Sequence, residues 1–417
     1  MNIINKIKKN KLIKDNITLF LGNALGAFFT FLFHFYMGRK LGPEDYGALG
    51  AILAIIYLFT IPITTIQTSI AKFASNFKAK NEINYLFEAA TKKLFIYSLI
   101  GSLIFIILSP LISSYLHIKI FPLLMLSLFI ISSVMLYINR GLLQGLQRFK
   151  NFSLNLILEG LIKFLVSLIL VFAGFKLNGA VGAIIFSYIS VFLISLHQIR
   201  DVFKFKIKKF NSNKIYKYSF PVLLTLLALT ALYSIDVLLI KHFFVDERAG
   251  YYVAISLLGK VLFFGSLPIT QVMFPKVSEF YYKKKLTRHL LYKSILIQLV
   301  FMIPLIIIYF LFPEFILNFL YGSSYLETSN LLGWFAVIMA LFSLIYLIAF
   351  YNLSIHRKGF LYILFLFNIL ELVLIYLFHE SLSQVVIILL ILMFILLFVM
   401  FLYTILKNET KHNNSST

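Results

Sequence analysis

Residues 38–47 read Gly38-Arg39-Lys40-Leu41-Gly42-Pro43-Glu44-Asp45-Tyr46-Gly47 and lie between two long apolar runs. A weakened copy returns in the second half of the chain, where residues 241–250 read Lys241-His242-Phe243-Phe244-Val245-Asp246-Glu247-Arg248-Ala249-Gly250. In both stretches an apolar run ends in basic residues, passes a short acidic turn and reaches a glycine that opens the next apolar run. A motif repeated across half a chain indicates duplication, and many membrane transporters are built from two repeated halves.

The composition is that of a membrane protein. Of 417 residues, 61% are hydrophobic and only 13% are charged, which is far from the composition of a soluble domain. The net charge of +22 does not indicate nucleic-acid binding, because the basic residues separate apolar runs instead of gathering on one solvated face. The chain has no cysteine, which excludes disulfides, thiolate metal sites and cysteine nucleophiles.

The apolar runs predict an all-α, polytopic membrane protein with about 12 transmembrane helices, each run being close to the roughly 20 residues that a bilayer core requires. The runs lie at 16–38, 48–71, 94–116, 121–139, 152–173, 177–199, 218–240, 250–275, 294–312, 326–352, 360–379 and 383–406. In the first of them, Gly22-x-x-x-Gly26 predicts a close approach to another helix of the same chain.

Lysine and arginine concentrate in alternate loops, so the positive-inside rule places both termini in the cytoplasm. Lys204-Phe205-Lys206-Ile207-Lys208-Lys209 reads as a polar cytoplasmic linker, or as an interfacial helix whose basic residues contact anionic lipid. We therefore expect two six-helix lobes, residues 1–210 and 211–417, in the cell membrane (plasma or inner membrane). The loops predicted outside the membrane are short, so any function is expected to lie between the helices.

Ionisable residues deep in a span cost several kcal/mol and are candidates for function. Five such residues occur: Glu159, Lys163, Asp236, Lys260 and Glu371.

Glu159 and Lys163 are four residues apart with the acid first, the spacing at which the two can neutralise each other in a buried structural pair. Lys260 has no acid one helical turn away, so it needs a partner from another helix or an anionic ligand. Asp236 and Glu371 are candidates for binding a coupling proton or cation, or for acting as counter-ions of Lys260 or Lys163, and Glu159 is a third coupling-ion or counter-ion candidate.

No cofactor or metal site is predicted. The eight histidines are scattered without metal spacing, and no glycine-rich phosphate loop followed by Lys-Ser/Thr is present, so the chain carries no nucleotide-driven motor of its own.

Five motifs, in the order of a known family, resemble the polysaccharide transporter family. They are Leu41-Gly42-Pro43-Glu44-Asp45-Tyr46-Gly47, Arg140-Gly141-Leu142-Leu143-Gln144-Gly145-Leu146-Gln147-Arg148-Phe149-Lys150 in an expected loop between helices four and five, Ala249-Gly250-Tyr251-Tyr252, Phe274-Pro275-Lys276, and Tyr321-Gly322-Ser323-Ser324-Tyr325. This family belongs to a superfamily that also contains the multidrug and toxin extruders and the flippases of lipid-linked peptidoglycan precursors.

The resemblance implies a flippase for lipid-linked oligosaccharides, with two six-helix lobes around a cavity that opens alternately to each side. Its cargo would be a glycan joined to a polyprenyl carrier by pyrophosphate, with a proton or sodium as coupling ion and polysaccharide assembly enzymes as partners. Lys260 and Lys163 are then the candidate cations for pyrophosphate, and Arg39 a third at the outer mouth. The other interpretation of Arg39 is an interfacial anchor.

Three other functions are alternatives to the flippase. A multidrug or cation antiporter of the related extruder family would use Asp236 and Glu371 to attract cationic drugs. A membrane glycosyltransferase or polymerase could use Glu44-Asp45 as an acidic motif, but it needs a longer outer loop to hold the sugar. A channel is disfavoured because the sequence has no re-entrant, filter-like segment.

Overall fold

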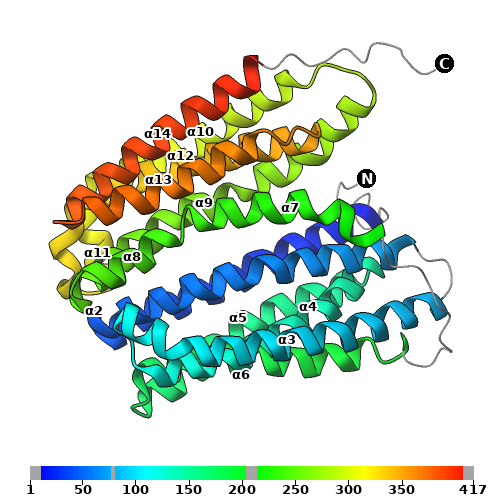
Figure 1. Ribbon diagram of the computed structural model, residues 1–417, viewed down its shortest axis with the longest axis horizontal. Helices are drawn as coiled ribbons and strands as arrows, with labels where there is room; N and C mark the ends of the chain where they lie inside the picture. Colours follow the sequence, from blue (N-terminus) through cyan, green and yellow to red (C-terminus); the bar gives the residue numbers. More distant parts are fainter. Residues whose placement is uncertain (1–10, 77–79, 203–213, 407–417) are drawn as a thin grey trace, which may run out of the picture. The chain divides into compact units, whose positions relative to one another are not determined.

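The computed structural model describes residues 11–76, 80–202 and 214–406 (Figure 1). Within these ranges the chain forms helices and turns, without a strand. The chain divides into two compact units, Met1–Leu223 and Leu224–Thr417. The predicted linker Lys204–Lys209 lies outside the described residues.

The described part of unit 1 contains five helices and the first part of a sixth. Its helices are α2 (Lys11–Asn76), α3 (Lys80–Leu116), α4 (Ile120–Gly145), α5 (Phe149–Phe172) and α6 (Lys176–Gln198), and α7 (Lys214–Ala231) begins in it. Unit 2 contains the end of α7 and the elements α8 (Ile235–Phe243), α9 (Asp246–Tyr282), α10 (Arg288–Leu311), α11 (Pro313–Leu320), the 3₁₀ turn η2 (Ser323–Thr328), α12 (Ser329–Ser354), α13 (Phe360–Leu377) and α14 (Leu382–Leu406).

Helix α2 holds two spans. Its apolar part, Ile17–Lys72, has 56 residues, which at 1.5 Å per residue is roughly 84 Å, far more than the roughly 30 Å of a bilayer core. The helix is broken at Gly42, whose φ of 74° and ψ of 173° suit glycine alone. Figure 1 shows α2 in two blue segments that meet at a sharp turn. The motif at residues 38–47, with which the sequence analysis began, therefore forms the turn between the first two spans.

The described ranges contain eleven helices or helix pairs that are long and apolar enough to cross a membrane. Because one of them is α2 with its two segments, the prediction of about 12 transmembrane helices in an all-α membrane protein is confirmed. The span at Phe220–Phe243 consists of α7 and α8, which are separated by a short break at residues 232–234.

The prediction of a loop at residues 140–150, between the fourth and fifth spans, is wrong for most of that segment. Helix α4 continues to Gly145, so Arg140 is helical and its side chain is buried, and only residues 146–148 separate α4 from α5. The physical reason is a carboxylate on α5 that compensates the arginine charge, as described below. Arg140 is consequently not a loop residue, and its charge does not count when the positive-inside rule is applied to the loops.

The two units share one type of interhelical contact. In unit 1 the Nδ2 of Asn139 on α4 donates to Ser195 Oγ on α6 at 2.7 Å. In unit 2 the Nδ2 of Asn352 on α12 donates to Thr404 Oγ1 on α14, also at 2.7 Å. All four side chains are buried. If α2 is counted as two spans and α7 with α8 as one, the same amide-to-hydroxyl bond joins the fourth and the sixth span in each half of the chain.

An arginine beyond each of these asparagines makes a second, similar contact. Arg148 donates to the backbone oxygen of Gln198 at 2.8 Å and forms two bonds to the Asp201 carboxylate, at 2.8 and 2.5 Å. Arg357 donates to the backbone oxygen of Thr404 at 3.0 Å. Hydrogen bonding to Asp201 raises the pKa of Arg148, so its guanidinium stays charged. Arg148 thus ties the start of α5 to the end of α6, and Arg357 ties the end of α12 to the end of α14.

Candidate functional site

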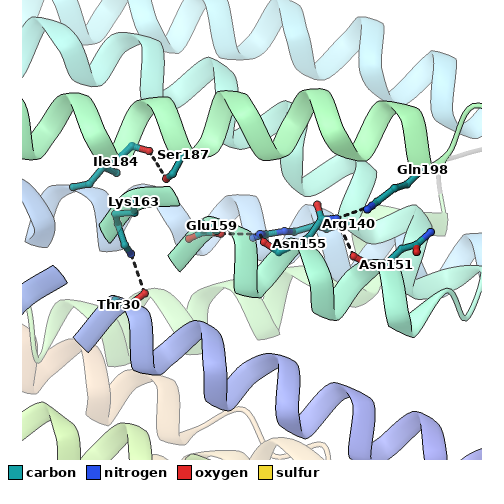
Figure 2. A network of polar contacts seen from close by, with 9 residues as sticks. All are labelled: Thr30, Arg140, Asn151, Asn155, Glu159, Lys163, Ile184, Ser187 and Gln198. Atoms are coloured by element: carbon teal, nitrogen blue, oxygen red, sulfur yellow. Dashed lines mark hydrogen bonds and ion pairs between the residues drawn. The ribbon is translucent and has the colours of Figure 1, made fainter. Parts of the chain in front are cut away.

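Three charged side chains meet inside unit 1, on α4 and α5 (Figure 2). The Nη2 of Arg140 lies 2.8 Å from Oε2 of Glu159, with 2% and 17% of the two side chains exposed. The same nitrogen donates to the backbone oxygen of Asn155 at 3.1 Å, and the guanidinium lies 5.4 Å from the ring centroid of Tyr137. A buried arginine is tolerated in a helix bundle only when it is paired in this way.

A neighbouring amide connects this pair to α6. The Nδ2 of Asn155 donates to Gln198 Oε1 at 2.6 Å and to the backbone oxygen of Asn151 at 2.9 Å. Figure 2 shows Asn155 between Arg140 and Gln198. Three helices, α4, α5 and α6, are therefore linked through one buried polar network.

Lys163 contacts a different helix. Its ammonium donates to Thr30 Oγ1 on α2 at 3.0 Å and lies 5.5 Å from the ring centroid of Phe33. Among the described residues, Glu159 forms its ion pair with Arg140 and not with Lys163, so the pairing expected from the i,i+4 spacing is not formed. The trio contains two cations and one anion, and unit 1 therefore has an excess of buried positive charge.

Glycines bring α2 close enough for this contact. A Cβ on Gly160 would lie 2.6 Å from the backbone oxygen of Gly26, and a Cβ on Gly26 would lie 2.7 Å from the backbone oxygen of Leu156. The close approach predicted from Gly22-x-x-x-Gly26 is confirmed, and it is made with α5. Thr30, one turn beyond Gly26, is thereby placed within reach of Lys163.

Unit 2 gathers the other three predicted residues. Asp236 on α8, Lys260 on α9 and Glu371 on α13 are all at most 3% exposed. The charge of Lys260 interacts with both carboxylates, and the two carboxylates interact with each other. The counter-ion role of Asp236 and Glu371 stays a prediction, and Lys260 is the cation on which both carboxylates act.

Hydrogen bonds satisfy only part of this cluster. Tyr252 donates its hydroxyl to Oδ2 of Asp236 at 2.7 Å, and the Lys260 ammonium lies 5.5 Å from the ring centroid of Tyr233. Within the described part of the chain, Oδ1 of Asp236 and both oxygens of Glu371 are buried without a hydrogen-bond partner. Each of these three oxygens is therefore a buried acceptor that no described residue satisfies.

The break between α7 and α8 explains the position of Asp236. Helix α7 ends at Ala231 and α8 begins at Ile235, which puts Asp236 in the first turn of the new helix. The N-terminal end of a helix carries partial positive charge, and it stabilises a carboxylate there. Discontinuous spans of this kind often line the binding sites of transporters.

Some residues of these clusters were not predicted. Arg140 was predicted to begin the loop between the fourth and fifth helices, directly after the apolar run that ends at residue 139. Tyr252 was quoted only as part of a family motif, although it, Ser256 and Lys260 recur every four residues and so share one face of α9. Arg39 lies in neither cluster: it is exposed at the end of the first segment of α2, with its guanidinium 5.4 Å from the ring centroid of Phe35.

Comparison with known proteins gives a family and a fold. A family model described as polysaccharide biosynthesis protein matches residues 36–330. An uncharacterized membrane protein of Methanocaldococcus jannaschii is 25% identical over 289 residues, which cover 64% of this chain and 68% of that protein.

Several solved structures share the fold. An inward-facing multidrug resistance MATE family transporter of the MOP superfamily has a TM-score of 0.74 at 15% identity, covering 92% of this chain and 94% of its own. The lipid II flippase MurJ in an inward closed conformation has a TM-score of 0.73 at 16% identity, covering 95% and 88%. A MOP superfamily transporter from Pyrococcus furiosus, for which reverse polarity of the binding pocket suggests a different function, has a TM-score of 0.64 at 16% identity and covers 94% of both chains.

Proposed function

The chain belongs to the family of polysaccharide biosynthesis proteins, and we propose that its function is to flip a polyprenyl-pyrophosphate-linked oligosaccharide from the cytoplasmic to the outer leaflet of the cell membrane. Its multi-pass fold is that of MOP-superfamily transporters and of a lipid II flippase. In this proposal both termini are cytoplasmic, and the glycan head group crosses by alternating access while the polyprenyl chain stays in the bilayer.

The observation that carries the proposal is the environment of Lys260. Its ammonium is buried within a span and has no hydrogen-bond partner in the part of the chain that the structure describes, while two carboxylates act on it. A buried ammonium without hydrogen bonds is poised to bind an anion, and pyrophosphate is the anionic group of the proposed cargo.

The two carboxylates supply a way to couple transport to an ion. When Asp236 and Glu371 are both ionised, they compete with pyrophosphate for Lys260. When they bind a proton, or sodium, that competition is reduced and Lys260 becomes available to the cargo. Uptake of the ion and binding of the cargo are then linked, and this linkage provides the differential binding that alternating access requires.

The remaining candidate residues have different roles in this scheme. Lys163 is a second contact for phosphate, because its acid neighbour Glu159 is engaged by Arg140 and its own bond is to the neutral hydroxyl of Thr30. Glu159 has a structural role, since taking up a coupling ion would require it to release Arg140. Arg39 attracts the anionic head group at the mouth of the protein.

The test compares polyprenyl-linked glycans by mass spectrometry in a strain lacking the gene and in its parent. Accumulation of a linked glycan with loss of surface polysaccharide is expected, and the mass identifies the cargo. Complementation with Lys260→Ala should fail, whereas Lys276→Ala, which changes an exposed lysine of the same helix, should restore the parental pattern. Equal complementation by the two variants, at equal membrane abundance, would remove Lys260 from the binding site.

A multidrug or cation antiporter is the second candidate. The observation that favours it is the excess of carboxylate in unit 2, where Asp236 and Glu371 face a single lysine. In that case the deletion strain would show no glycan accumulation and a greater sensitivity to cationic drugs.

A further inference from the structure

Helix α11 and the residue before it present three aromatic side chains away from the rest of unit 2, and together these form what we call the aromatic face of α11. Phe312, Phe315 and Phe319 are 55%, 69% and 62% exposed, and the rings of Phe315 and Phe319 stack with centroids 6.0 Å apart. Leu317 is completely buried. At about 100° per residue Leu317 points roughly 200° from Phe315, so the helix is held by one face and displays the opposite one.

The position of α11 follows from the end of the preceding span. Helix α10 is apolar up to Leu311, and Ile307, Ile308 and Leu311 are exposed along it as lipid-facing residues of a transmembrane helix are. Pro313 then starts a new helix, because it has no N–H with which to continue the old one. Since only Phe312 separates the two helices, α11 begins at the depth where the hydrocarbon core ends.

The polar residues of α11 are arranged to suit that depth. Glu314 and Asn318 are both exposed and lie on one flank, about 60° to 100° from Phe315 around the helix axis. A helix lying in the plane of the membrane can therefore keep this flank in water while its phenyl rings enter the lipid. Glu314 is the one charged residue of α11, so attraction to anionic head groups does not explain the surface.

Trp334 marks the same boundary on α12. It is 48% exposed, and its ring meets Phe310 edge-on with centroids 5.3 Å apart. Trp and other aromatic side chains concentrate where the acyl chains meet the head groups, because the ring is apolar and its N–H remains hydrated. Phe310, two residues before Phe312, and Trp334 thus form an exposed-side aromatic pair on the two spans that contact α11.

We propose that the aromatic face of α11 is a membrane-interface anchor, in which Phe312, Phe315 and Phe319 insert at the acyl–glycerol boundary of one leaflet. The anchor holds the connected ends of α10 and α12 at a fixed depth while other parts of the protein move. Its partner is the bilayer itself, and the inference does not depend on the transported cargo.

The test uses the single tryptophan of the chain as a spectroscopic handle. In a Trp334→Phe background, tryptophan is placed on the aromatic face by Phe315→Trp and on the polar flank by the matched control Glu314→Trp. Each protein is reconstituted in phosphatidylcholine vesicles that carry bromine on the acyl chains, and iodide is added to the water. We expect bromolipid to quench Phe315→Trp at least about twofold more than Glu314→Trp, and iodide to show the opposite order.

Two results would overturn the anchor. Equal iodide quenching of the two variants would place the aromatic face in water. Protection of Phe315→Trp from both quenchers would mean that protein, such as a second copy of this chain, covers the face. A folding control comes from Trp334→Phe itself, whose elution profile and thermal unfolding should match those of the unaltered protein, and each tryptophan variant is compared with it.

Discussion

Glu159→Gln tests whether the buried network of unit 1 is held by its ion pair. The substitution keeps the shape of the side chain and removes its charge. Arg140, of which 2% is exposed, then loses its compensating negative charge and keeps only neutral contacts: the amide oxygen introduced at position 159, the backbone oxygen of Asn155 at 3.1 Å and the ring of Tyr137. Lys163 also loses the nearest acid on its helix.

We expect a large loss of stability, and a larger one when the acid is neutralised than when the arginine is removed. Removing one partner of a buried pair typically costs 3–5 kcal/mol, because the other charge stays buried without compensation, and we expect Glu159→Gln to lower the free energy of unfolding by about 3 kcal/mol. Arg140→Met should cost less, about 1–2 kcal/mol, because Glu159 is partly exposed and the ammonium of Lys163, one turn along the helix, can take over as its partner. The double variant Arg140→Met/Glu159→Leu removes both charges and should be closer to the unaltered protein than Glu159→Gln is.

Unfolding of the purified protein in detergent, followed by circular dichroism, provides the measurement. Glu279→Gln is the matched control, because it breaks an ion pair with Lys283 in which both side chains are more than half exposed, and no measurable change is expected. If Glu159→Gln were as stable as this control, the ion pair would not hold the network, and the structural role assigned to Glu159 would be wrong.

Two further predictions concern the coupling residue and the helix approach. Asp236→Asn should change the pH or sodium dependence of transport, measured as glycan translocation in vesicles with imposed gradients; an unaltered dependence would make Asp236 structural. Gly160→Ala should destabilise unit 1 by about 1–3 kcal/mol, because the added Cβ would lie 2.6 Å from the backbone oxygen of Gly26 and must push α2 away from α5. Its unfolding is compared with that of Gly101→Ala, where no atom lies within 4 Å of the added Cβ.

The two clusters differ in the sign of their excess charge. Arg140, Glu159 and Lys163 in unit 1 comprise two cations and one anion, while Asp236, Lys260 and Glu371 in unit 2 comprise two anions and one cation. Both units contain the interhelical Asn-to-hydroxyl contact, but the excess charge of their buried clusters differs in sign.

The sequence by itself determined the class of this protein and the number of its spans. Apolar runs of bilayer length, separated by basic loops, leave few alternatives to a bundle of transmembrane helices, because backbone polar groups in lipid must be satisfied within each segment. The motif around Gly42 and the ordered family motifs also depend only on local residues, and the family they indicated is confirmed by the match over residues 36–330.

Only the tertiary structure decided which charges meet. Lys163 and Glu159 are neighbours in sequence, yet their partners are Thr30 and Arg140 on other helices. Sequence spacing reports which residues share the face of one helix, but a buried charge is stabilised by whichever helix packs against that face, and that packing is set by long-range contacts such as Gly26 against α5. The same reason explains why α4 extends past Arg140: the acid that permits it lies on another helix.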